Sequence, residues 1–296
     1  MSRIGLGLLW LLHLLPYGVI GRIGTAMGVV LWPLARKRRA ITLRNLELCF
    51  PDWTQARREQ VGRAHFICVS RAFLERVVLW WASPARLEQV LHLRGAVDEA
   101  LHGDGAVLLL GIHFEGMDAA WTALTLAAQR PLSGMYTPQK SKVLDRWVLD
   151  GRSRFHTERI VSRHEGAGGM LRALRRGTPF YTLPDMDFGE RHSRFIPFFG
   201  VPAATLDAVP RLAASSKARV YPVVARMLPG YAGYEITIHP AWDHFPTLRD
   251  GRLADIDADL LRMNHFIEQR VLEMPEQYHW VHKRFKTRPP GEPSLY

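Results

Sequence analysis

The first 40 residues constrain this chain most strongly, because a long uncharged stretch is followed by a basic run. Residues 4–21 contain no Asp, Glu, Lys or Arg, and a transmembrane helix needs roughly 20 apolar residues. Arg22 interrupts the pattern, apolar sequence continues to Ala35, and RKRR follows at 36–39. We therefore expect residues 1–40 to form a hydrophobic membrane anchor with a basic flank, and residues 41–296 to form a separate domain.

Two other interpretations of the N-terminus stay open to different degrees. A cleaved signal peptide is disfavoured, because apolar sequence continues past any plausible cleavage point. His13 and Pro16 interrupt the uncharged stretch, so a helix lying in the membrane interface is an alternative to a spanning one. In either case the basic run is expected on the cytoplasmic face, next to anionic headgroups.

The composition points to an anionic partner. The chain carries 39 Lys and Arg against 28 Asp and Glu, a formal net charge of +11. Such an excess favours nucleic acid, an anionic lipid surface or an acidic carrier protein. The apolar N-terminus and the lack of a recognised binding motif argue against nucleic acid. Cys49 and Cys68 provide neither a disulfide framework nor a metal-ligand pattern, which indicates a reducing compartment.

Predicted strands and helices alternate from about residue 100. The unbroken apolar run GAVLLLGI at 105–112 predicts a strand that is buried on both faces. A helix is expected over 118–129 and another strand over 178–187. This alternation predicts an α/β fold with a largely parallel or mixed sheet flanked by helices, behind the membrane-associated helical segment.

His113 directly follows the buried run, and Asp118 lies five residues further on. An imidazole at a strand end can accept a proton near neutral pH, and a carboxylate on its other ring nitrogen fixes the tautomer. Glu115 is a second carboxylate that could fill this role. A helix beginning near Phe114 is expected to offer free N–H groups to an oxyanion. The alternative is a buried structural histidine, since short motifs often match by chance.

Three further segments contain candidate substrate-binding residues. In PDMDFG, Asp185 and Asp187 form either a turn or a positioning site, with too few ligands for a metal. The segment at 194–205, RFIPFFGVPAAT, is either a core loop or an apolar wall for a long-chain ligand. Its candidate residues are Phe198, Phe199 and Gly200. Arg152 and Arg154 can bind phosphate oxygens, or they form a solvated helix end.

The order of these segments resembles the bacterial lipid A late acyltransferase family, a branch of the lysophospholipid acyltransferases. The resemblance covers nearly the whole chain and runs through HFEGMD, LPDMDFG and the C-terminal segments. Its most specific pieces are IPFFGVPA and PEQYHWVHKRFKTRP. One departure is Met186, which stands where the family often has Gln and cannot offer amide hydrogen bonds. The acceptor lipid is therefore not fixed by the sequence.

The resemblance implies an acyltransferase with a glycerolipid acyltransferase-like fold over residues 41–296. The acyl donor would be a thioester of acyl carrier protein or coenzyme A, and the acceptor a hydroxyl of a lipid A precursor or related membrane lipid. His113 would be the general base and Asp118 its orienting partner. The resemblance implies no acyl-enzyme, cofactor or metal, in agreement with the absence of a G-x-S-x-G motif. The implied location is the bacterial inner membrane, with the catalytic domain facing the cytoplasm.

Two rival functions use the same residues. A thioesterase would use His113 to activate water instead of a lipid hydroxyl. A non-catalytic membrane protein could share the fold, although the intact His113 and Asp118 argue against it. A divergent member acylating another amphiphile is a third alternative.

Overall fold

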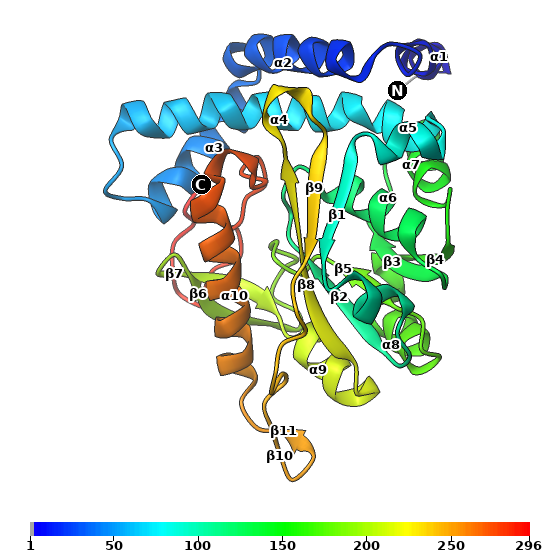
Figure 1. Cartoon of the computed structure of the whole chain (residues 1–296). Coiled ribbons are helices and arrows are strands. Elements are labelled where there is room, and N and C mark those ends of the chain that lie inside the picture. The colour runs from blue at the N-terminus through cyan, green and yellow to red at the C-terminus, as the bar shows by residue number, and fades with distance from the viewer. Residues whose placement is uncertain (1–2) are drawn as a thin grey trace.

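A computed structural model, which describes residues 3–296, places seven strands in one mixed sheet of order β1-β9-β8-β2-β5-β3-β4 (Figure 1). Neighbouring strands run parallel except β8 and β9, which are antiparallel. The predicted α/β fold with a largely parallel, mixed sheet is confirmed. The strand bounds are β1 (Leu91–Gly95), β2 (Val107–Gly111), β3 (Leu132–Tyr136), β4 (Thr157–Ser162), β5 (Phe180–Thr182), β8 (Arg219–Met227) and β9 (Tyr234–Ile238).

Strand β2 occupies the centre of the sheet, as its apolar sequence requires. It pairs with β5 on one side and β8 on the other, and all five of its residues are buried. Because both faces are covered, no alternation of polar residues is needed. Its carboxyl end, where parallel α/β sheets commonly bind ligands, leads directly into His113.

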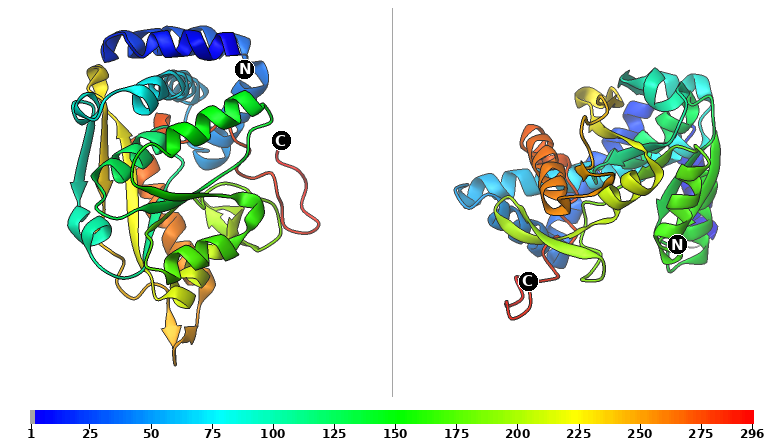
Figure 2. Two further views of the ribbon diagram at one scale, coloured as in Figure 1. Left: turned by 90° about the vertical axis from the view of Figure 1, so that its right-hand side faces the viewer. Right: turned by 90° about the horizontal axis from the view of Figure 1, so that it is seen from below.

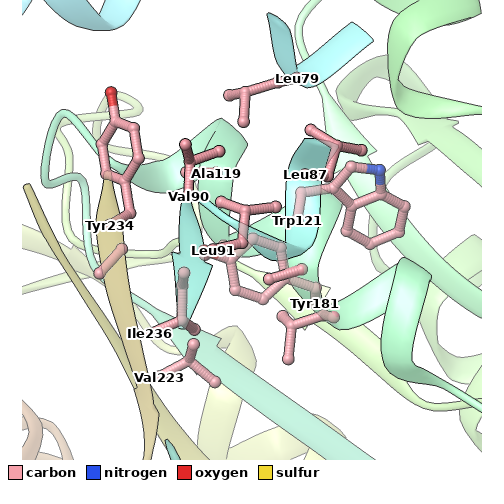
Figure 3. Close-up of a cluster of buried hydrophobic side chains, with 14 of the residues drawn as sticks. Leu79, Leu87, Val90, Leu91, Ala119, Trp121, Tyr181, Val223, Tyr234 and Ile236 are labelled. Carbon is pink, nitrogen blue, oxygen red and sulfur yellow. The ribbon is translucent and has the colours of Figure 1, made fainter. Parts of the chain in front are cut away.

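Helices cover both faces of the sheet (Figure 2). One core cluster joins the sheet to α4, α6 and α7, and Figure 3 shows part of it around Trp121 and Tyr181. The other cluster joins the sheet to α8, α9 and α10. The helix bounds are α3 (Arg36–Cys49), α4 (Gln55–Trp81), α5 (Pro84–Glu88), α6 (Met117–Ala127), α7 (Lys142–Arg152), α8 (Ala167–Arg175), α9 (Ala208–Ser216) and α10 (Ile256–Glu273).

Two small hairpins complete the fold. Strands β6 (Ser193–Phe198) and β7 (Val201–Leu206) form one, and β10 (Leu248–Arg249) with β11 (Arg252–Leu253) form the other. The β6–β7 hairpin packs against α10. The β10–β11 hairpin lies at the end of the molecule opposite α2 (Figure 1).

The N-terminal segment forms two helices, not one uninterrupted helix over residues 4–21. Helix α1 (Arg3–Leu12) ends before Pro16, which precedes the first residue of α2 (Tyr17–Leu34). Pro16 favours this break, because a proline has no N–H to donate to the preceding turn and its fixed φ suits the start of a helix. Among the described residues, α2 is the helix that is long and apolar enough to cross a membrane.

Helix α2 lies along α4 through a stripe of glycines (Figure 1). A Cβ atom on Gly24 would lie 2.8 Å from the Arg71 Cα, and one on Gly28 would lie 2.5 Å from the Ile67 Cα. The two backbones can therefore approach closely only because these residues lack side chains. The opposite side of α2 and much of α1 expose large apolar side chains: Ile4, Leu8, Trp10, Leu11, Leu14, Ile23, Val29, Val30, Leu31 and Leu34.

Candidate active site

His113 is held by Asp185 and not by Asp118. The ring Nδ1 lies 2.7 Å from Asp185 Oδ1, and the backbone N–H of His113 donates to Asp185 Oδ2 at 3.0 Å. Asp185 is fully buried. Although burial disfavours its charged form, the ring and N–H of His113 hold the pKa of Asp185 below its usual value. The expectation that Asp118 orients His113 is therefore wrong, and Asp185 is a partner of the histidine instead of a substrate ligand.

Asp118 is bound by two arginines. Its Oδ2 accepts from Arg76 Nε of α4 at 2.7 Å, and its Oδ1 accepts from Arg152 Nε of α7 at 2.8 Å. Helix α6 begins only at Met117, so Asp118 lies in its first turn and is directed toward α4 and α7. Despite burial, the two guanidinium groups lower the pKa of Asp118 to about 2. This carboxylate joins three helices.

Glu115 has a third kind of partner. Its Oε1 lies 2.8 Å from His279 Nδ1, and the Glu115 side chain is buried. The turn between β2 and α6 thus contains three titratable residues with three separate partners. The oxyanion donors predicted near Phe114 are largely used within the fold, because the N–H groups of Phe114, Glu115 and Met117 donate to backbone carbonyls.

Arg152 and Arg154 lie in different surroundings. Arg152 is committed to Asp118, whereas Arg154 donates to the carbonyls of Leu79 and Ala82 at the C-terminal end of α4. Arg154 also lines a cavity of about 610 Å³, together with Leu6, Trp80, Trp81, Lys142, Val143, Arg146, Trp147, Asp150 and Gly151. A shared phosphate site for the two arginines is therefore not formed.

Asp187 ties down the C-terminal segment. It accepts from the N–H and Oγ1 of Thr287, at 2.6 and 2.8 Å, and from the N–H of Gly189 at 2.9 Å. These bonds occupy the carboxylate, so the expectation that it binds substrate is replaced by a structural role. The cause is proximity, because the loop after β5 runs beside the end of the chain.

The expected apolar wall is the tip of the β6–β7 hairpin. Phe198 is fully buried and packs against Tyr278. Phe199 and Gly200 form the two-residue turn, with φ of 48° and 75°. Positive φ at both positions is what the favoured two-residue hairpin turn requires. Phe198 is therefore a core residue, and the chain-binding role expected for Phe199 and Gly200 stays a prediction.

Sequence reasoning missed Arg76 and His279. Arg76 lies 42 positions before its partner Asp118, and His279 lies 164 positions after Glu115. Residue spacing contains no signal for such pairs. Among residues 3–296, no group of three or more His, Cys, Asp or Glu side chains is arranged to hold a metal ion.

The chain matches a protein-family model described as "Bacterial lipid A biosynthesis acyltransferase" over residues 1–287. It is 34% identical to the lipid A biosynthesis lauroyltransferase of Escherichia coli K12 and 32% identical to its palmitoleoyltransferase. Each alignment covers 100% of this chain and 94% of the relative. The myristoyltransferase of the same organism is 31% identical, covering 94% of this chain and 83% of the relative.

A solved structure of the 1-acyl-sn-glycerophosphate acyltransferase from Thermotoga maritima matches with a TM-score of 0.40 and 12% identity. That match covers 86% of this chain and 97% of the other, and is too weak to add to the assignment. The sequence comparisons are decisive by themselves, since both the model and the relatives extend over almost all of the sheet, the helices and the segment containing His113. The chain belongs to the bacterial lipid A biosynthesis acyltransferase family and is an acyltransferase.

Proposed function

We propose that this enzyme transfers a fatty acyl chain from a thioester of acyl carrier protein or coenzyme A to a hydroxyl of a lipid A precursor. The observation that carries the proposal is the His113–Asp185 pair at the carboxyl end of β2. Nδ1 of His113 is committed to Asp185, while Nε2 has no hydrogen-bond partner within residues 3–296. The ring is partly exposed, so this nitrogen is available to a substrate.

In this mechanism His113 is the general base. Its Nε2 accepts the hydroxyl proton while the hydroxyl oxygen attacks the thioester carbonyl carbon. The C–S bond then breaks, the thiolate leaves with the electron pair, and a proton from the histidine or from solvent restores the thiol. Asp185 fixes the tautomer and stabilises the imidazolium as it forms. No covalent acyl-enzyme is required.

The Asp118 cluster has a supporting role in this proposal. One carboxylate between two guanidinium groups leaves an excess positive charge beside the site. Arg76 and Arg152 keep about a fifth to a quarter of their side chains exposed. This excess charge favours an anionic acceptor such as a phosphorylated lipid. The same cluster fixes the first turn of α6.

The N-terminal helices support a membrane location. Their exposed apolar residues, followed by the basic residues 36–39, fit attachment to the cytoplasmic face of the bacterial inner membrane. We propose residues 1–40 as the anchor and residues 41–296 as the acyltransferase domain. An acidic carrier protein suits the positive charge of the chain.

A product analysis with purified full-length enzyme tests the proposal. The enzyme is supplied with acyl carrier protein thioester or coenzyme A thioester and with lipid A precursor in detergent. We expect a lipid heavier by one acyl chain and an equal amount of released thiol, and neither with His113→Ala. Free fatty acid as the sole acyl product would identify a thioesterase, and activity in His113→Ala equal to wild type would overturn the role of His113.

A further inference from the structure

A second histidine–carboxylate pair lies beside the first. The buried side chain of Glu115 contacts His279 Nδ1 at 2.8 Å, while the His279 ring is partly exposed. Burial disfavours the charged form of Glu115, but His279 and, more weakly, His65 and Arg76 hold its pKa below the usual value. Glu115 is therefore a carboxylate that favours a positively charged imidazole at His279.

The backbone fixes the two histidines relative to each other. Phe114 and Tyr278 form an antiparallel bridge, and the N–H of His279 donates to the carbonyl of His113 at 2.9 Å. The two imidazole centroids are 6.4 Å apart, with 37° between the ring planes. Both rings use Nδ1 for a buried carboxylate, and within residues 3–296 neither Nε2 has a hydrogen-bond partner.

Acyl transfer creates negative charge on the thioester carbonyl oxygen, and this charge needs a donor. The nearby backbone supplies few N–H donors. Four amides of the turn already donate elsewhere, namely those of His113, Phe114, Glu115 and Met117. A side-chain donor close to His113 can supply the hydrogen bond that these four amides cannot, and the His279 ring lies 6.4 Å from the His113 ring between centroids.

The remaining imidazoles of this cluster are suited to a neutral state. Burial lowers the pKa of His65 to about 4, although Glu115 lies near it. Burial, together with the neighbouring His279 and His113, lowers the pKa of His282 to about 4. The two histidines of this cluster that contact a carboxylate are His113 and His279.

We propose that His279, charged and held by Glu115, donates a hydrogen bond from Nε2 to the thioester carbonyl oxygen during acyl transfer. This inference rests on the proposed function. His279 is then a catalytic residue and Glu115 a positioning residue. The pair completes a site in which His113 accepts a proton and His279 stabilises the oxyanion.

The test is the rate of acyl transfer by full-length enzyme with acyl carrier protein thioester and lipid A precursor, measured as kcat and as KM for the thioester. His279→Ala should lower kcat about 100-fold, the usual effect of removing one oxyanion donor, and leave KM close to wild type. His279→Gln, which keeps a neutral donor, should recover part of kcat.

Glu115→Gln should also lower kcat, because it removes the negative charge that supports an imidazolium at His279. His102→Gln is the matched control, since His102 pairs with the exposed Asp98 at 3.0 Å on a different part of the surface. It should retain the wild-type kcat and KM.

The inference is overturned if His279→Ala transfers acyl chains at a rate close to wild type. It is also overturned if His279→Gln is as slow as His279→Ala, because the role of the ring would then be structural. Absence of transfer by the wild-type enzyme would refute the proposed function, and this inference with it.

Discussion

Two buried carboxylates on either side of the β2–α6 turn differ in what they bind. Asp185, from the loop after β5, contacts a histidine, a side chain that can accept and release a proton. Asp118, in the first turn of α6, contacts two arginines that stay charged at all accessible pH values. The first arrangement can control proton transfer, whereas the second can only hold charges and helices in place. A carboxylate is therefore assigned its role by its partner and not by its distance in sequence from His113.

The largest effect is expected from Asp185→Asn. The amide can donate to the ring, which stabilises the wrong tautomer of His113 and removes the charge that supports the imidazolium. We expect acyl transfer to fall at least about 1000-fold, judged by the comparable substitution in serine proteases. The measurement is kcat at matched protein concentration, with thermal unfolding as the control for folding. A loss below tenfold would show that Asp185 does not orient the base.

Asp118→Asn should act mainly on stability. It leaves Arg76 and Arg152 without a counter-ion in a largely buried position, and removing one partner of a buried ion pair typically costs 3–5 kcal/mol. Because both arginines are partly exposed, we expect about 2–3 kcal/mol. Urea unfolding measures the change. A variant with unchanged stability and no activity would return Asp118 to a direct role in the chemistry.

The partner of His113 depends on strand pairing, which explains why sequence reasoning chose the wrong carboxylate. In the parallel pair of β2 and β5, Leu110 lies opposite Thr182. His113 lies three residues after Leu110, and Asp185 lies three residues after Thr182. The two side chains therefore meet at the same edge of the sheet. The sequence marks both as polar residues after a strand, but it does not reveal that these strands are neighbours.

Local patterns predicted the elements that depend on local interactions. The helix expected over 118–129 is α6, and the strand expected over 105–112 contains β2. Patterns failed where a tertiary contact overrides them. The strand expected over 178–187 is shorter, because β5 ends at Thr182. Beyond it, Asp185 binds His113 and Asp187 binds Thr287 instead of continuing the strand.

Acid should reveal how much the ion-paired Asp118 contributes to the free energy of unfolding. The pKa of Asp118 is lowered from 3.8 to about 2, a difference corresponding to about 2 kcal/mol. A carboxylate whose pKa is lower in the folded state stabilises that state at pH values above its unfolded-state pKa. This contribution is lost as the pH falls through the folded-state pKa. Urea unfolding of the wild type should therefore lose this contribution between pH 4 and about 2, and Asp118→Asn should show a flatter dependence. Parallel plots of unfolding free energy against pH for the wild type and Asp118→Asn would contradict the ion-pair role assigned to Asp118.

The smallest effect is expected at Asp187, a third carboxylate near the site, which binds neither a histidine nor an arginine. It accepts from the N–H and hydroxyl of Thr287, so Asp187→Asn keeps one acceptor and places an amide against a donor. We expect the free energy of unfolding to fall by about 1.5–2 kcal/mol, the lower part of the range for hydrogen bonds to a charged group, with less than tenfold loss of activity. Asp150→Asn, whose partner Arg146 is exposed, is the control and should change little. A loss of activity comparable to that of Asp185→Asn would mean that Asp187 contacts substrate, and that a carboxylate satisfied by backbone and hydroxyl donors can still take part in the reaction.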